Sequence, residues 1–190
     1  MLARIAMILV DVVGTFFVYL LLLRFLFQLL RVPFYNQAGQ FVMATTNWLV
    51  KPARRLIPSL FGLDLASLVC AWLVQCLMLA LLLMLGGRDL GAAPGIAAGV
   101  IAALAVVDLL QACLRVLMVV LIVQAVMSWI NPHNPLQGVL DMVTRPFLRP
   151  IRRFIPPLGG VDLSPMVLIV VILILHEPLG ELRLMVRGLF

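Results

Sequence analysis

Residues Lys51–Ala66 read KPARRLIPSLFGLDLA, and residues Arg149–Ser164 read RPIRRFIPPLGGVDLS. The two stretches align without a gap at an offset of 98 residues, and nine of their sixteen positions are identical. Chance does not produce such a match in a chain with only 14 lysines and arginines. The chain therefore contains an internal repeat, and this repeat determines how its hydrophobic segments are arranged.

The composition places the chain in a membrane. Of its 190 residues, 64% are hydrophobic and 12% are charged, and the mean hydropathy is +1.18. A soluble fold of this size does not hide so much apolar surface. A spanning helix needs about 20 mostly apolar residues, and four runs are long enough, at about 5–30, 63–85, 100–130 and 163–184. We therefore expect an all-α membrane protein with four transmembrane helices.

The third run is the hardest to interpret, because with its polar interruptions it extends over the 36 residues from Gly95 to Ile130. A single helix of that length measures about 54 Å, well beyond the ~30 Å hydrocarbon core. The run is either one tilted, protruding helix or two short spans broken at Asp108–Arg115. Five spans would put the two repeated stretches on opposite sides of the membrane, so we prefer four.

The distribution of positive charge predicts the orientation. With four spans, eight basic residues fall on one side and four on the other. The larger set is Arg31, Lys51, Arg54, Arg55, Arg145, Arg149, Arg152 and Arg153. Because positive charge is enriched on the cytoplasmic side, we predict that both basic stretches are cytoplasmic and that both chain termini are on the opposite, periplasmic side.

Each copy of the repeat has the same order of parts: a span, an amphipathic segment, the motifs PxRRxIP and GxD, and a second span. Residues 1–92 form the first unit and residues 93–190 the second. Because each unit holds two spans, both units enter the membrane in the same direction, which makes a parallel repeat. We expect the amphipathic segments to be interfacial helices. Their apolar faces are predicted to carry Phe41, Thr45, Trp48 and Leu49 in the first copy and Leu136, Val139, Leu140, Val143 and Phe147 in the second.

The basic elbows, defined as residues 51–64 and 149–162, are rich in proline and arginine. Their prolines remove amide donors and are predicted to turn the chain at the membrane surface. These are Pro52, Pro58, Pro150 and Pro156. After Gly62 and Gly160, Asp64 and Asp162 are predicted to be helix N-caps of the following spans. Basic residues at head-group depth each contribute about 1 kcal/mol of attraction to anionic lipid, or they bind a partner protein. The candidates are Lys51, Arg54, Arg55, Arg149, Arg152 and Arg153.

This arrangement resembles a family of small bacterial membrane proteins. The doubled PxRRxIP and GxDL motifs, with FYN at Phe34–Asn36 and SW at Ser128–Trp129, look like the YggT family, called YlmG in Gram-positive bacteria and plastids. The resemblance covers nearly the whole chain and implies two copies of a two-span unit in a bacterial inner membrane. It implies less about activity. Members are linked to division and nucleoid organisation, to osmotic or ionic stress and, in plastids, to haem attachment on a cytochrome b.

Charged and small residues within the spans add further predictions. Ionisable groups in a membrane are costly and are functional candidates by default. Asp108, Gln111 and Arg115, at spacings of three and four, form a polar stripe on the third span. Arg24 lies six residues before the end of the first span, close enough for its side chain to reach the surface. A glycine at every fourth position predicts a small-residue face for close packing, within the chain or between copies. These glycines are Gly87, Gly91, Gly95 and Gly99.

Two functions fit these residues. The first is a non-enzymatic scaffold or assembly factor that docks anionic lipids or a membrane protein through its basic elbows. The second is a channel or transporter component in ion or osmotic balance, which would use the polar stripe. We expect no enzymatic activity and no metal or other cofactor, because no nucleophile with its base and no metal-binding cluster is visible. We also expect no nucleic-acid partner, while a homo-oligomer is compatible with the glycine face.

Overall fold

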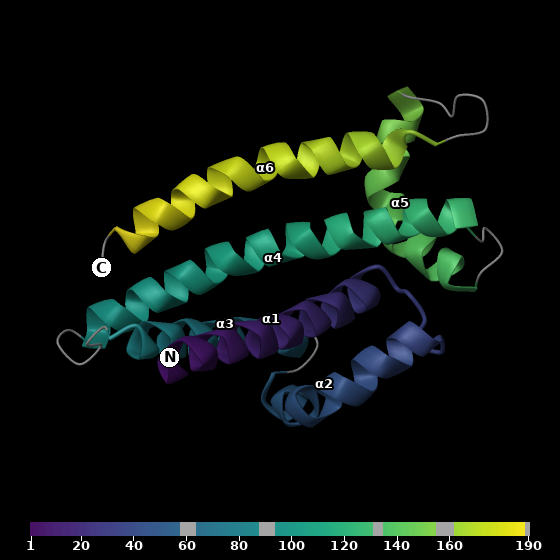
Figure 1. The fold of residues 1–190 in the computed structure, drawn as a ribbon. Coiled ribbons are helices and arrows are strands. Elements are labelled where there is room, and N and C mark those ends of the chain that lie inside the picture. Colours follow the sequence, from purple (N-terminus) through teal and green to yellow (C-terminus); the bar gives the residue numbers. More distant parts are fainter. Residues whose placement is uncertain (58–63, 88–93, 131–134, 155–161, 189–190) are drawn as a thin grey trace.

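The computed structural model describes residues 1–57, 64–87, 94–130, 135–154 and 162–188 of the chain. This part of the chain contains six α-helices and no strand (Figure 1). The helices are α1 (Leu2–Leu29), α2 (Gln37–Leu56), α3 (Leu65–Leu85), α4 (Pro94–Ile130), α5 (Pro135–Phe154) and α6 (Ser164–Arg187).

Four helices are long and apolar enough to cross a membrane: α1, α3, α6 and the part of α4 from Pro94 to Met127. They match the four predicted runs to within a few residues at most of their ends. α4 is continuous through Asp108–Arg115, so the alternative of two short spans is wrong. Its 37 residues give a length of about 56 Å, and Figure 1 shows it running the whole length of the bundle.

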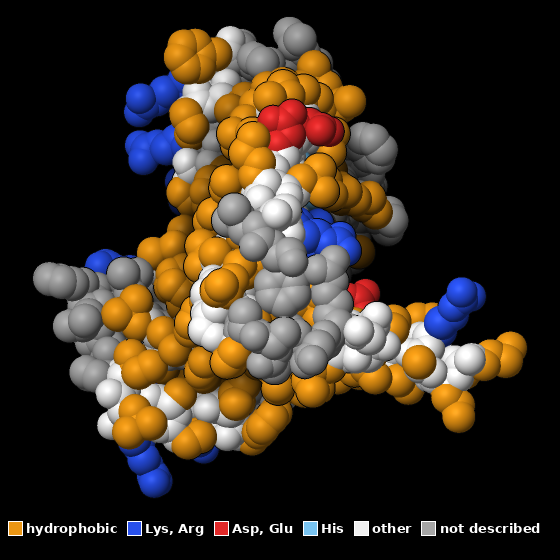
Figure 2. Space-filling model, turned by 90° about the vertical axis from the view of Figure 1, so that its left-hand side faces the viewer, with side chains coloured by type: hydrophobic (Ala, Val, Ile, Leu, Met, Phe, Trp, Pro, Cys, Tyr) orange, Lys and Arg blue, Asp and Glu red, His pale blue; other side chains and the backbone are white. Residues whose placement is uncertain are grey.

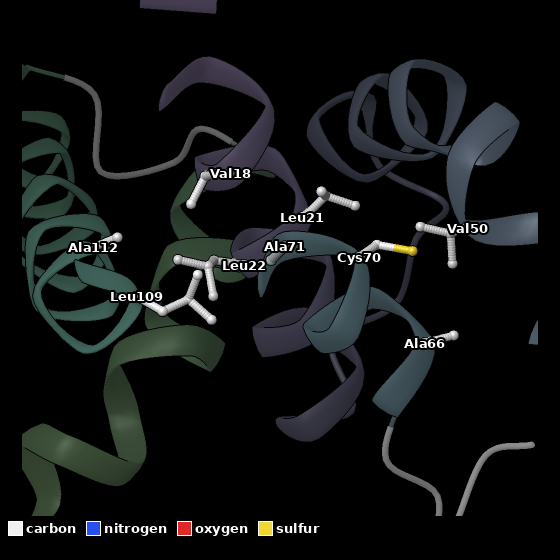
Figure 3. Packing of buried hydrophobic residues seen from close by; sticks show 9 residues of the cluster. All are labelled: Val18, Leu21, Leu22, Val50, Ala66, Cys70, Ala71, Leu109 and Ala112. Carbon is white, nitrogen blue, oxygen red and sulfur yellow. The ribbon is translucent and has the colours of Figure 1, made fainter. Parts of the chain in front are cut away.

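α4 is the central helix of the bundle. α6 packs along it, while α3 and α1 pack against each other and also contact α4. A buried cluster joins α1, α3 and α4 through side chains that include Leu22, Ala71, Leu109 and Ala112 (Figure 3). The two alanines leave room for the leucines opposite them, so the three helices approach closely at this level.

Much of the outer surface is apolar. Seen from the end at which both termini lie, hydrophobic side chains make up most of the coloured surface (Figure 2). On α6, for example, Val170 and Ile174 are exposed. In water such a surface would be unfavourable, so we assign it to contact with lipid.

α2 and α5 lie toward the opposite end of the bundle from the two termini (Figure 1). α2 packs on α1 and α3, and α5 packs on α4 and α6. Val42 and Val50 of α2 are buried, whereas Phe41 and Trp48 are exposed, and the Trp48 ring contacts Phe17 of α1 edge to face. In α5 the predicted apolar face packs on the protein, because Val139 and Val143 are buried.

Pro52 and Pro150 do not end the helices in which they lie. α2 continues past Pro52 to Leu56, and α5 continues past Pro150 to Phe154. Both prolines are exposed, so each ring projects away from the bundle and the carbonyl that lacks its amide partner is on the outer side of the helix. The prediction that these two prolines turn the chain is wrong. Pro58, Gly62, Pro156 and Gly160 lie outside the described residues.

The glycine face is not used for packing within the described chain. A Cβ atom added to Gly95 or Gly99 would meet no atom within 4 Å. Gly87 has a φ angle of 81°, a conformation that glycine adopts readily at the end of a helix. The expectation of close intramolecular packing is therefore wrong for Gly95 and Gly99, and Gly91 lies outside the described residues.

Candidate functional site

Arg24 of α1 is buried instead of reaching the surface. Its side chain is 3% exposed, and its Nε lies 3.5 Å from Oδ2 of Asp64, which is 1% exposed. Its Nη1 donates hydrogen bonds to Thr46 Oγ1 at 2.8 Å and to Asn47 Oδ1 at 3.0 Å. The surface position predicted from the sequence is wrong because α2 covers this part of α1. Arg24 therefore joins α1 to α2 and to the start of α3.

Asp64 is the N-cap residue of α3 and also the acceptor for arginine. Arg54 donates from Nη2 to Oδ2 at 2.6 Å and from Nε to Oδ1 at 3.2 Å. Ser67 donates its hydroxyl at 2.6 Å and its backbone amide at 3.4 Å. Burial acts to raise the pKa of the Asp64 carboxyl, but the hydrogen bonds from Arg54 and Ser67 and the charges of Arg54 and Arg24 together hold that pKa below its ordinary value.

An equivalent contact is present between α5 and α6. Arg152 donates from Nε to Asp162 Oδ2 at 2.9 Å, and its Nη2 lies 2.8 Å from the same oxygen. The N-cap position of α6 is Leu163, one residue later than predicted, and Asp162 accepts from the amide of Ser164 at 2.9 Å. Burial acts to raise the pKa of Asp162, but its bonds to Ser164 and Arg152 and the charge of Arg152 hold the pKa below its ordinary value.

We call these two contacts the arginine–aspartate clamps: Arg54 with Asp64 and Arg152 with Asp162. In each clamp the arginine is in the last turn of α2 or α5, and the aspartate lies ten residues later beside the start of the next span. Sequence reasoning placed all four residues in the elbows but missed the pairing. The signal was present, because both residue types recur at the same spacing in the two copies.

The remaining elbow residues stay exposed. Lys51, Arg55, Arg149 and Arg153 have exposed side chains, and in the described part of the chain none of them forms an ion pair. The clamps therefore divide the six predicted binding residues into two that hold the fold and four that face outward.

The predicted polar stripe lines a cavity of about 260 Å³ between α1, α3, α4 and α6. Asp108 accepts hydrogen bonds from Arg183 Nε and Nη2 of α6, the second at 3.3 Å, and from Gln75 Nε2 of α3 at 3.1 Å. Arg115 donates to Gln111 Oε1 at 3.4 Å. The stripe was predicted, but its partners on α3 and α6 were not, because no local pattern relates residues so distant in the sequence. Across the described residues, no group of three or more His, Cys, Asp or Glu side chains is placed to hold a metal ion.

The profile of the CCB3/YggT family matches this chain over residues 3–85 and 103–183. The chain belongs to the CCB3/YggT family. The resemblance inferred from the doubled motif is thus confirmed, and each clamp lies within one of the two segments matched by the YggT profile. An uncharacterized protein from Pseudomonas aeruginosa is 35% identical over 165 residues, which are 84% of this chain and 80% of the relative.

A second relative, the uncharacterized protein YggT from Escherichia coli strain K12, is 33% identical over 175 residues, which are 91% of this chain and 88% of the relative. No solved structure matches the chain at a significant level. Both relatives align along most of their length.

Proposed function

We propose that this YggT-family chain is a non-enzymatic scaffold or assembly factor of the bacterial inner membrane. It consists of two parallel repeats, and both elbows face the cytoplasm. The observation that supports this function is the pair of outward-facing dipeptides that end the interfacial helices, Arg55-Leu56 on α2 and Arg153-Phe154 on α5. All four side chains are exposed, and Leu56 and Phe154 are about 85% accessible.

The clamps support this role because they hold each dipeptide in place. Arg54 and Arg152, which directly precede the exposed arginines, are fixed to Asp64 and Asp162. Ordering the backbone beforehand lowers the entropic cost of binding a partner. A charged side chain next to an exposed apolar one on an ordered helix end is well suited to a protein contact.

Electrostatic attraction to lipid explains the basic residues of the elbows but not the exposed apolar side chains beside them. At about 1 kcal/mol for each basic residue near an anionic surface, the four exposed residues contribute roughly 4 kcal/mol. A protein partner adds the burial of Leu56 and Phe154, at about 1.5–3 kcal/mol for each large apolar side chain. The proposal therefore assigns anionic lipid an orienting role and a membrane protein with an acidic cytoplasmic surface the role of specific partner.

Site-specific photo-cross-linking in cells tests this proposal. A cross-linking residue at position 56 or 154 should capture a protein, whereas one at Leu77, an exposed position of α3, should capture mainly lipid. The adduct should disappear in the Arg55→Glu, Arg153→Glu double variant and persist in Arg4→Glu, which reverses an exposed charge at the other end of the bundle. Identical adducts from positions 56 and 77, or an adduct that survives the double reversal in correctly inserted protein, would contradict the proposal.

The polar cavity favours a second candidate function, that of a channel or transporter component. Its walls carry Asp108, Gln111 and Arg115 within the apolar helix α4, where such groups mark ion or solute paths. Purified protein in liposomes should then pass K⁺ or a small osmolyte, and Asp108→Asn should reduce the flux. Liposomes that stay tight to every solute tested would eliminate this function and leave the scaffold role untouched.

A further inference from the structure

The cavity holds two charged side chains that lack an ion-pair partner in the described chain. Asp108 and Arg183 neutralise each other. Asp11 of α1 and Arg115 of α4 also line the cavity, but neither faces an opposite charge within ion-pair distance among the described residues. The hydrogen bond that Arg115 donates to Gln111 is to a neutral amide and is long, at 3.4 Å.

The cavity extends from the middle of α3 to the last turns of α6, where Arg183 lies four residues before the end of the helix. Gln75, which contacts Asp108, is the eleventh of the 21 residues of α3, about 15 Å from either end of that helix. Asp11 and Arg115 lie within α1 and α4, and both side chains are exposed, so a ligand in the cavity can reach them. An ionised side chain within a span is costly unless it has a partner or water. The cavity therefore offers an external group one carboxylate and one guanidinium, neither of which forms an ion pair among the described residues.

The two free charges define the chemistry of the ligand. A simple anion would leave Asp11 unpaired, and a simple cation would leave Arg115 unpaired. A molecule that carries both an ammonium and an anionic group satisfies both at once. A guanidinium binds carboxylate or phosphate well because its donors match two oxygens. Thr15 and Tyr19, which also line the cavity, add hydroxyl groups that can donate or accept.

We propose that this cavity binds a small zwitterionic group, an ammonium linked to a carboxylate or phosphate, with the ammonium at Asp11 and the anionic group at Arg115. The Asp108–Arg183 pair forms a neutral part of the wall. The volume of about 260 Å³ is below the ~300–1,000 Å³ typical of drug-sized sites, which fits a ligand of this size. The site does not depend on the scaffold role, and it does not require the ligand to cross the membrane.

Two sources supply this chemistry: the head group of an aminophospholipid that enters from the bilayer, and a free zwitterionic solute such as an amino acid. O-phosphoethanolamine carries the shared chemistry in soluble form, while inorganic phosphate and ethanolamine each carry one half of it. Full-length protein in nanodiscs should bind O-phosphoethanolamine at least about tenfold more tightly than either half, since each charge-assisted contact adds at least that factor.

Variants of Asp11 and Arg115 test whether these two side chains bind the ammonium and the anionic group of the ligand. Arg115→Gln and Asp11→Asn should each remove the preference for O-phosphoethanolamine, whereas Arg55→Gln, which removes an exposed charge on α2, should keep it. Arg115→Lys and Asp11→Glu retain the charges and should keep part of the affinity, so they separate loss of the ligand from loss of the fold.

Native mass spectrometry then identifies the source. If the wild-type protein retains phosphatidylethanolamine in preference to phosphatidylglycerol, and both neutral variants lose it, the ligand is a lipid head group. If no lipid is retained and glycine competes with O-phosphoethanolamine, the ligand is a free solute. The proposal is overturned if phosphate binds as tightly as O-phosphoethanolamine, if no probe binds, or if both neutral variants bind like the wild type.

Discussion

The Asp64 carboxylate holds three helices together, because it receives Arg24 from α1, Arg54 from α2 and Ser67 from α3. The corresponding aspartate of the second clamp, Asp162, is less critical in two respects. Asp162 is 31% exposed, and within the described part of the chain its carboxylate contacts one arginine, Arg152.

We expect Asp64→Asn to destabilise the protein much more than Asp162→Asn. Removing Asp64 leaves Arg24 charged and buried, and breaking a buried ion pair costs about 3–5 kcal/mol. A pair that solvent reaches, such as the half-buried one at Asp162, is worth less, with exposed pairs contributing about 0.2–1 kcal/mol. The free energy of unfolding of both variants in detergent micelles, measured with a chemical denaturant, checks this prediction. Equal losses would show that the buried arginine is not the cause.

The lowered pKa of Asp64 predicts a pH dependence. In the unfolded chain this carboxyl takes up a proton near its ordinary pKa of about 3.9, whereas in the folded chain it remains charged to lower pH. Its contribution to stability is therefore complete above that value and is lost as the pH falls through the lower pKa of the folded state. The thermal unfolding midpoint of the wild type should be steady from pH 7 to about 5 and fall below about 4.

The Asp64→Asn variant is the control for this pH dependence, because it cannot titrate at position 64. Its unfolding midpoint should be lower at neutral pH and should fall less steeply in acid than that of the wild type. The same acid slope in both proteins would assign the dependence to other carboxyl groups.

Individual contacts were the part of the site that the sequence revealed least. Arg54 and Arg152 are predicted to face lipid or a partner, yet both bind aspartates of the same chain. The doubled spacing of arginine and aspartate contained that information. Asp108 and Arg183 are 75 residues apart in the sequence. No periodic pattern in the sequence predicts a contact over that distance, because the contact depends on how α6 packs on α4.

The helices themselves were largely predictable, because hydrophobic length is a local property of the sequence. The four spanning helices and the two shorter helices that precede the elbows, α2 and α5, were expected near their observed positions. The errors came from local rules that the surroundings override. Pro52 and Pro150 remain within helices since they face outward, and α4 stays continuous through Asp108 because its polar side chains find partners on neighbouring helices.

Glycines at similar places in α2 and α5 offer a matched test of helix packing. A Cβ added to Gly39 of α2 would lie 2.8 Å from the Cα of Phe34, whereas one added to Gly138 of α5 would meet nothing within 4 Å. We expect Gly39→Ala to cost about 1–3 kcal/mol through overpacking. Gly138→Ala should instead stabilise the protein by about 0.5–1 kcal/mol, since glycine weakens a helix. The thermal unfolding midpoints of both variants test these two predictions. A loss of stability of the same size in each would contradict the explanation by local packing.

The arrangement of the whole chain predicts which positions are accessible from each side of the membrane. Both termini lie at one end of the bundle, with α2 and α5 toward the other (Figure 1). If the proposed orientation holds, with the exposed basic residues of the elbows on the cytoplasmic side, a membrane-impermeant maleimide should label Arg4→Cys in spheroplasts. It should label Arg55→Cys and Arg153→Cys only in inverted vesicles.

This labelling requires a background in which Cys70, Cys76 and Cys113, all free thiols, are replaced. Cysteine at Leu77, an exposed position within α3, serves as the control that neither preparation labels. Labelling of Arg55→Cys but not of Arg4→Cys in spheroplasts would reverse the proposed orientation.

The pairing of Arg24 with Asp64 also constrains how the chain is made. The ribosome adds Asp64 forty residues after Arg24, so at about 5–20 residues per second the guanidinium exists for roughly 2–8 s before its carboxylate. During that interval an arginine within a span opposes release into lipid by about 2.5–3.5 kcal/mol near the helix centre, and less toward its end. We expect α1 to remain beside the translocon until α3 begins to emerge, so that the pairing of Arg24 with Asp64 sets the order in which the nascent helices leave the translocon.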